Sequence, residues 1–141
     1  MKKIGSILFL LIFFSISLAY AGRITVTVKN IKTITGVIRV ALYNKKEDFP
    51  KKGREYKTKD VPVKAKKVIY TFKDIPEGWY AIALYHDINN DNTCNKNFFG
   101  IPVEPFGFSN NIKVKFSAPK FDKCSFFVNG NVKLSIELYK K

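Results

Sequence analysis

The chain has 141 residues, of which 46% are apolar and 15% aromatic, and a formal net charge of +14 from 25 Lys and Arg against 11 Asp and Glu. This length suits one domain, and the apolar content excludes wholesale disorder. A single His and two Cys exclude a metal site with several His ligands and a four-cysteine zinc site.

The beginning of the chain has the pattern of a secretory signal peptide. Two lysines precede an apolar run that is shorter than the roughly 20 residues needed to span a membrane. The run ends in an A-x-A cleavage site at residues 19–21, which would leave Gly22 as the first residue. We therefore expect a signal peptide at 1–21, one domain at 22–141 and a secreted or periplasmic protein. No second long apolar segment follows, so we expect no membrane span after cleavage.

After the cleavage site, apolar and polar residues alternate in short runs that are separated by turn residues. A period of two predicts strands with one buried face. The predicted strands are residues 23–30, 36–43, 67–73, 79–87, 111–117 and 131–139, with a shorter one near 57–63. This pattern predicts an all-β fold, an antiparallel β-sandwich of the prealbumin or immunoglobulin kind with about seven strands.

Three features of these strands can be checked directly. A Pro–Gly turn at 76–78 precedes Tyr80, which we expect either to pack inward or to anchor the corner through its hydroxyl. The alternation in 111–117 assigns Phe116 to the buried face. Asn129-Gly130 predicts a tight hairpin between a short segment and the last strand.

Oxygen-bearing side chains follow the predicted strand 79–87. Asp87, Asn89 and Asp91 stand at alternate positions, as in the first half of a calcium-binding loop, and Asn95 and Glu104 add further oxygens. The glycine and the final glutamate of the EF-hand pattern are missing. These five residues are predicted to form a weak Ca²⁺ site. The alternative is an Asx-rich turn in which the same oxygens accept backbone N–H groups.

His86 has two interpretations. We expect a histidine at the edge of the core that holds the following loop with a hydrogen bond. The alternative is a small hydrolase that uses His86, Asp87 and Glu104 in one cleft. Ser109 lies in GFSNN, which differs from the G-x-S-x-G motif of hydrolases. Since no catalytic motif is evident, we expect a protein that is not an enzyme.

Cys94 and Cys124 are the only cysteines. In an oxidising compartment they predict a disulfide between the Asx-rich loop and the segment 119–127. The alternative is two unpaired thiols.

The run from His86 to Asn111 resembles a known family, the secreted bacterial proteins of domain of unknown function 2141, which carry a run like HDxNxNGxLDxNxxGxPxExxGFSNN. The resemblance extends to 36–43, 76–80 and 119–121. The matching residues in the run are His86, Asp87, Asn89, Asn97, Gly100, Pro102, Glu104, Gly107, Phe108, Ser109, Asn110 and Asn111. Asn95 stands where the family often has Asp, which counts against metal binding. The turn before Tyr80 is also similar to turns of transthyretin-like sandwiches. The resemblance implies a small secreted β-sandwich without an established activity.

The basic charge allows two interpretations. Only Arg23, Arg39 and Arg54 are arginines, so the excess is mostly Lys and can simply reflect composition. The other interpretation is binding to an anionic surface such as lipopolysaccharide, teichoic acid, membrane lipid or DNA. Scarce arginine and the lack of a known motif argue against specific nucleic-acid recognition. We expect a binding or accessory module of the cell envelope, whose partner is an anionic envelope polymer or another envelope protein.

Overall fold

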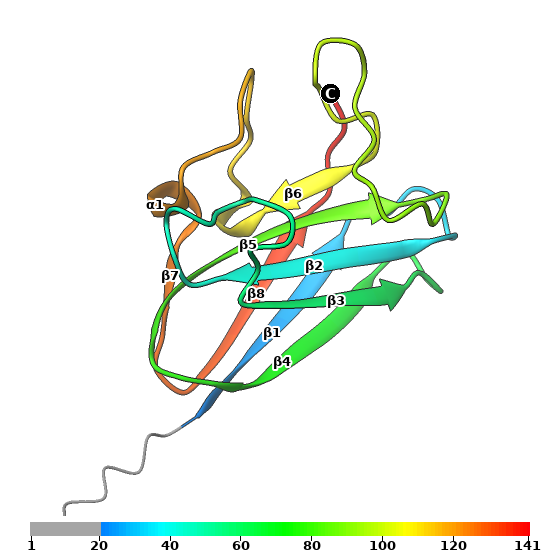
Figure 1. The fold of residues 1–141 in the computed structure, drawn as a ribbon. Helices are drawn as coiled ribbons and strands as arrows, with labels where there is room; N and C mark the ends of the chain where they lie inside the picture. Colours follow the sequence, from blue (N-terminus) through cyan, green and yellow to red (C-terminus); the bar gives the residue numbers. More distant parts are fainter. Residues whose placement is uncertain (1–20) are drawn as a thin grey trace, which may run out of the picture.

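The computed structural model describes residues 21–141, which form two β-sheets packed face to face (Figure 1). Residues 1–20, which hold nearly all of the predicted signal peptide, lie outside the described residues. The elements are β1 (Gly22–Lys29), β2 (Val37–Tyr43), β3 (Lys57–Pro62), β4 (Val68–Ile75), β5 (Gly78–Asp87), β6 (Phe106–Phe108), η1 (Ser109–Asn111), α1 (Phe121–Cys124), β7 (Phe126–Val128) and β8 (Asn131–Glu137). The prediction of an all-β sandwich is confirmed.

The two sheets differ in size and in strand direction. The small sheet has the order β4-β1-β8, and the large sheet has the order β3-β2-β5-β6, with β7 also paired to β5. Every pair is antiparallel except β1 with β8, which is parallel. Alternate side chains point inward whichever way a strand runs, so the sequence pattern does not reveal this one parallel pair.

The core lies between the sheets and is formed by the alternating residues that the sequence pattern predicts. Aliphatic side chains of β1 face those of β2 and β5 across the sandwich. The completely buried aliphatic residues of these three strands are Ile24, Val26, Val28, Ile38, Val40, Leu42 and Ile82. Burial of each such side chain contributes roughly 1.5–3 kcal/mol, so this face sets the register of the strands.

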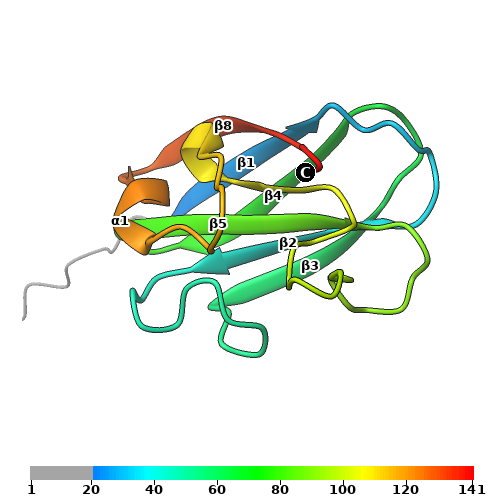
Figure 2. The same cartoon turned by 90° about the horizontal axis from the view of Figure 1, so that it is seen from above.

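The outer face of the large sheet is covered by loops rather than by a third layer. The 44–56 loop, the segment from η1 to α1 and the end of the chain pack on β2, β5 and β6 (Figure 2). Their apolar side chains form a second, smaller cluster. Its buried members are Ala41, Tyr43, Phe49, Ala81, Phe106, Phe108, Phe121 and Cys124.

Two local predictions are wrong. Residues 111–117 form no strand but lie mostly in a projecting loop, and Phe116, expected to be buried, is 97% exposed. Alternation is not sufficient here because no neighbouring strand pairs with this segment. The Asn129-Gly130 turn is no hairpin, since β7 pairs with β5 and β8 pairs with β1. The turn carries the chain from one sheet to the other.

The corner before β5 forms as expected. The Tyr80 ring is buried in the main core, and its hydroxyl donates a hydrogen bond to the Pro76 carbonyl oxygen at 2.9 Å. The bond closes the turn between β4 and β5, which belong to different sheets.

Candidate functional site

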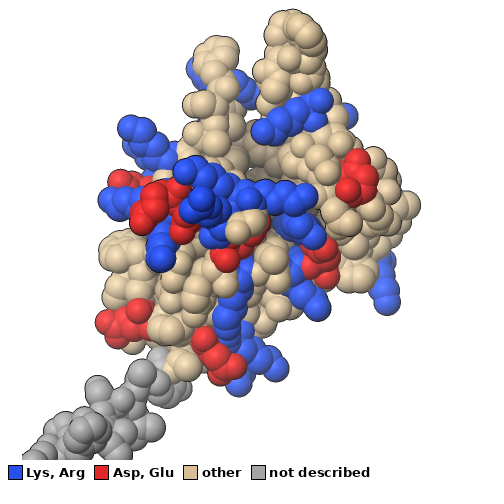
Figure 3. Space-filling view, in the orientation of Figure 1, with Lys and Arg blue, Asp and Glu red and all other residues tan. Residues whose placement is uncertain are grey.

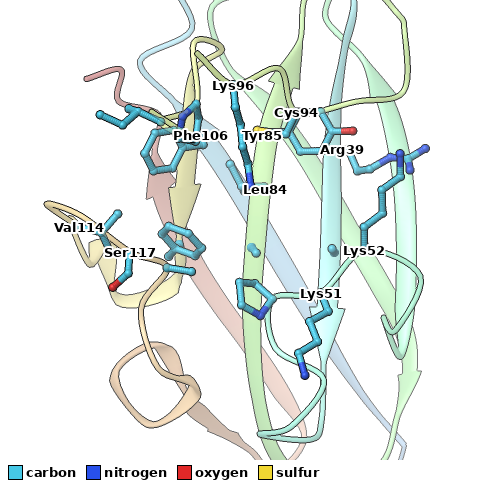
Figure 4. Close-up of a pocket in the computed structure, with 18 of the residues that line it drawn as sticks. Arg39, Lys51, Lys52, Leu84, Tyr85, Cys94, Lys96, Phe106, Val114 and Ser117 are labelled. Carbon is cyan, nitrogen blue, oxygen red and sulfur yellow. The ribbon is translucent and has the colours of Figure 1, made fainter. Parts of the chain in front are cut away.

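A groove of about 690 Å³ opens on the outer face of the large sheet. Its floor comes from β2, β5 and β6, and its walls come from three loops: residues 44–56, 88–105 and 112–120. Figure 4 shows Lys51 and Lys52 on one side of the groove and Val114 and Ser117 on the other. The volume is within the usual range for pockets that bind small molecules.

The floor is apolar and owes its depth to two small residues. Ala41 and Ala83 lie opposite each other in the β2–β5 ladder, and both line the groove. Phe106 and Phe108 of β6 continue the apolar floor beside them. Gly107 between them faces the small sheet, where a Cβ atom would lie 2.8 Å from Ile136 Cγ2. A larger residue at 107 would therefore push the β6 edge of the floor outward.

The rim of the groove is basic. Lys51, Lys96, Lys115 and Lys141 line it, and none of these four takes part in an ion pair within residues 21–141. Glu55 is the only acidic residue of the lining. Arg39 also lines the groove, but its guanidinium is held by both carboxylate oxygens of Asp60 at 2.7 Å, so its charge is largely offset.

Tyr85 and Cys94 lie near one end of the groove, close to Lys96 (Figure 4). The Tyr85 hydroxyl has no hydrogen-bond partner among the described residues. Burial raises the pKa of Tyr85 to about 12, so the hydroxyl keeps its proton at neutral pH. The hydroxyl oxygen is itself buried, so it is a polar group without a partner beneath the groove surface rather than an open contact for a ligand.

The oxygens of the predicted calcium site are used by the protein itself. The two carboxylate oxygens of Asp87 accept the N–H groups of Asp91 and Asn92, at 3.1 and 2.8 Å. Glu104 accepts the N–H groups of Ile88 and Asn95, at 3.0 and 3.2 Å. This arrangement is the Asx-rich turn that the sequence left as the alternative.

The remaining members of the predicted site bond to one another. Asp91 Oδ2 accepts hydrogen bonds from the side-chain amides of Asn89 and Asn95, at 3.0 and 2.9 Å. These bonds, with the N–H of Thr93, lower the pKa of Asp91. Within residues 21–141 no group of three or more His, Cys, Asp or Glu side chains is placed to hold a metal ion. The residues present therefore do not fit a preformed Ca²⁺ cage, and calcium stays a prediction from the sequence pattern.

The three residues of the hydrolase alternative are not brought into one cleft. His86 and Asp87 are neighbours on β5, so their side chains point to opposite faces of the sheet. Both are 1% exposed, Glu104 is buried as well, and none of the three lines the groove. His86 Nε2 lies 2.7 Å from the Thr35 carbonyl oxygen, so the histidine holds the loop between β1 and β2 rather than the loop that follows it.

The predicted disulfide between Cys94 and Cys124 is wrong, because both residues are free thiols. Cys124 is fully buried in α1, among the aromatic side chains of the second cluster, whereas Cys94 is half-buried beside the groove. Burial raises the pKa of both thiols to about 11, so both stay protonated at neutral pH.

The remaining residues of the family-like run hold loops in place. Ser109 is fully buried, accepts the Ile82 N–H at 2.9 Å and donates to the Cys124 carbonyl oxygen at 2.5 Å. Asn110 donates to two carbonyl oxygens around the end of α1. Asn97 accepts two backbone N–H groups at the tip of the 88–105 loop. In that loop Pro102 pairs with Lys96 in an isolated bridge.

The comparison with protein families confirms the resemblance to domain of unknown function 2141. The family model described as "Uncharacterized protein conserved in bacteria (DUF2141)" matches residues 26–135. The chain belongs to this family. The match runs from β1 to β8 and so includes both projecting loops and all of the groove lining except Lys141. No curated protein and no solved structure matches the chain significantly.

Sequence reasoning missed the residues that form the groove in this DUF2141 domain. The strand alternation places Ala83 and Tyr85 on the face opposite the core, but it does not show which loops cover that face. The pair Phe98-Phe99, which stands in a polar, Asn-rich stretch outside any alternating run, marks the tip of the 88–105 loop but does not line the groove. Within residues 21–141 no helix is long and apolar enough to cross a bilayer.

Proposed function

We propose that this protein is a secreted binding module of the cell envelope, and that the groove on β2, β5 and β6 is its ligand site. The ligand class is an amphipathic anion, a hydrocarbon chain that ends in a carboxylate or phosphate group. The observation that carries the proposal is an apolar floor inside a rim of four unpaired lysines.

The two parts of such a ligand match the two parts of the groove. A hydrocarbon chain on Ala41, Ala83, Phe106 and Phe108 removes apolar surface from water on both partners. An anionic head group at the mouth meets lysines on three walls, with one acidic side chain among the lining residues. A purely polar ligand would leave the floor exposed to water, and an uncharged one would leave the lysines without a partner.

The place of action follows from the first residues of the chain. The 1–21 segment has the features of a cleaved signal peptide, and β1 begins at Gly22, the residue after the expected cleavage site. Outside the cytoplasm, amphipathic anions are abundant as fatty acids and phospholipid fragments of the envelope. The proposal therefore refines the general expectation of an envelope binding module with a basic surface.

A fluorescence titration tests the proposal. A dansyl-labelled fatty acid should bind the mature protein, dodecyl phosphate should displace it, and dodecanol should compete at least about tenfold less well because it lacks the charge. Ala83→Leu fills the floor and should weaken binding of the labelled acid at least about tenfold. The matched control is Ala65→Leu, on the exposed turn between β3 and β4, which should bind like the wild type. Equal binding by both variants, or no binding by the wild type, would overturn the proposal.

A further inference from the structure

Three phenylalanine side chains lie almost completely in solvent at the tips of two loops. Phe98 and Phe99 of the 88–105 loop are 98% and 81% exposed, and Phe116 of the 112–120 loop is 97% exposed. Both loops line the groove and rise from the same end of the molecule (Figures 1 and 3). Single exposed apolar residues are ordinary, but large aromatic ones gathered at one end indicate a docking surface.

The exposure of these rings follows from hydrogen-bonded turns. The Asn97 side-chain oxygen accepts the N–H groups of Phe99 and Ile101, each at 3.0 Å, and the Gly100 N–H donates to the Asn97 carbonyl oxygen at 2.9 Å. At the base of the other loop, the Tyr139 hydroxyl accepts the Val114 N–H at 3.1 Å. The backbone is thus fixed in a form that holds the rings away from the two apolar clusters.

The charge around the tips has one sign. Lys96 stands two residues before Phe98, Lys115 precedes Phe116, and the Lys141 ammonium lies 5.5 Å from the centre of the Phe116 ring. Neither 92–103 nor 105–121 contains an acidic residue, and Glu104 between them is buried. In Figure 3 the two projections carry no Asp or Glu on the visible face, and on the surface below them Lys and Arg are more extensive than the Asp and Glu among them.

We propose that Phe98, Phe99 and Phe116, the aromatic tips, dock the protein on an anionic phospholipid bilayer. The rings would enter the boundary between head groups and acyl chains, and the neighbouring lysines would pair with head-group phosphates. Apolar rings beside basic residues are the usual composition of interfacial membrane contacts. A bilayer also accepts rings at any spacing, whereas a protein partner needs a pocket matched to each ring. This surface shares Phe116 and the lysines Lys96, Lys115 and Lys141 with the rim of the groove, but it does not include the groove floor.

Vesicle co-sedimentation tests the docking surface. The mature protein should pellet with phosphatidylglycerol–phosphatidylethanolamine vesicles and far less with phosphatidylcholine vesicles, and salt should weaken the binding because it screens the lysines. The triple variant Phe98→Ser, Phe99→Ser, Phe116→Ser should lower the partition coefficient about tenfold or more. These positions are exposed, so the melting temperature should stay close to that of the wild type.

The matched control removes exposed aromatic residues at the other end of β5. Trp79 and Phe127 are 58% and 44% exposed, with ring centres 5.3 Å apart. The variant Trp79→Ser, Phe127→Ser should bind vesicles like the wild type. Wild-type binding by the triple variant, equal loss in the control, or self-association through the tips in sedimentation velocity would overturn the proposal. The Ala83→Leu variant keeps the aromatic tips, so it should still pellet with vesicles. A loss of fatty-acid binding in this variant therefore tests the groove without testing the docking surface.

Discussion

Ala41 and Ala83 lie directly opposite each other in the antiparallel β2–β5 ladder, on the face that points away from the sandwich core. Cross-strand neighbours on one face lie about 5 Å apart, so two methyl groups together leave a shallow apolar hollow where larger side chains would fill it. Tyr43 and Tyr85 flank this pair along the strands. The groove is therefore formed by the strands themselves and is deepened by the loops around it.

The basic rim should select for negative charge. Lys51→Glu combined with Lys115→Glu reverses two unpaired rim charges and should weaken binding of dodecyl phosphate about tenfold, with a much smaller effect on dodecanol. Isothermal titration measures both affinities. Lys64→Glu with Lys66→Glu makes the same charge change outside the groove lining and serves as the control. An equal loss in both double variants would show that net charge, rather than the rim, governs binding.

Ser109 should be essential for stability. Its buried hydroxyl accepts the Ile82 N–H and donates to the Cys124 carbonyl oxygen, so Ser109→Ala leaves both backbone groups without these bonds. An unsatisfied buried group costs about 1–3 kcal/mol, and urea denaturation should show a loss of this size in the free energy of unfolding. Ser117→Ala on the exposed loop should change it by less than about 0.5 kcal/mol. Similar effects of the two substitutions would contradict the role of Ser109.

The ion pair between Arg39 and Asp60 should make stability depend on pH. The hydrogen bonds from Arg39 lower the pKa of Asp60 in the folded state. Its stabilising contribution is therefore present above the unfolded pKa of about 3.9 and is lost as the pH falls through the lower folded value. Asp60→Asn should cost at most about 1 kcal/mol at neutral pH, since the pair is partly exposed. Urea denaturation at several pH values should show the difference closing below about pH 4. A constant difference would contradict this account.

Both cysteines should behave as protected thiols. Because burial raises each pKa to about 11, alkylation at neutral pH should be slow in the folded protein. Half-buried Cys94 should react before Cys124, which should react only on unfolding. A reducing agent should leave the melting temperature of the purified protein unchanged. A drop of several degrees on reduction would show a disulfide that the structure lacks.

Asp87 should stabilise the 88–105 loop without metal. Its carboxylate accepts two backbone N–H groups, so Asp87→Ala should lower the free energy of unfolding by about 1–3 kcal/mol even in EDTA. Thermal melts of wild type and variant with EDTA or millimolar Ca²⁺ measure this. If Ca²⁺ raises the wild-type melting temperature but not that of the variant, the site predicted from the sequence pattern binds the ion.

Much of the fold was predictable because one face of each long strand is buried. Alternation located β1, β2, β4, β5 and β8 to within a few residues. It failed where burial has another cause: β6 is only three residues long, and Ile112 and Val114 alternate because they pack on the second cluster from a loop.

The candidate site was less predictable because it depends on contacts distant in sequence. The sequence pattern placed the candidate site in the family-like run. The side chains of this run mostly form hydrogen bonds with backbone groups, as Asp87, Glu104 and Ser109 do. The groove is lined instead by residues that belong to no recognisable motif, such as Ala83 and Lys51. Their place in the groove depends on which loops lie beside them in the fold. The disulfide was wrong because redox compartment and cysteine count do not fix where two thiols point.

The most direct test of the groove is an NMR titration of alanine methyl groups with dodecyl phosphate. The account predicts that the Ala41 and Ala83 methyl signals shift in a saturable way, while the exposed Ala65 methyl at the β3–β4 turn does not move. Shifts centred on Ala65, or no shift at Ala41 and Ala83 when the ligand is bound, would contradict a ligand site on the outer face of the large sheet.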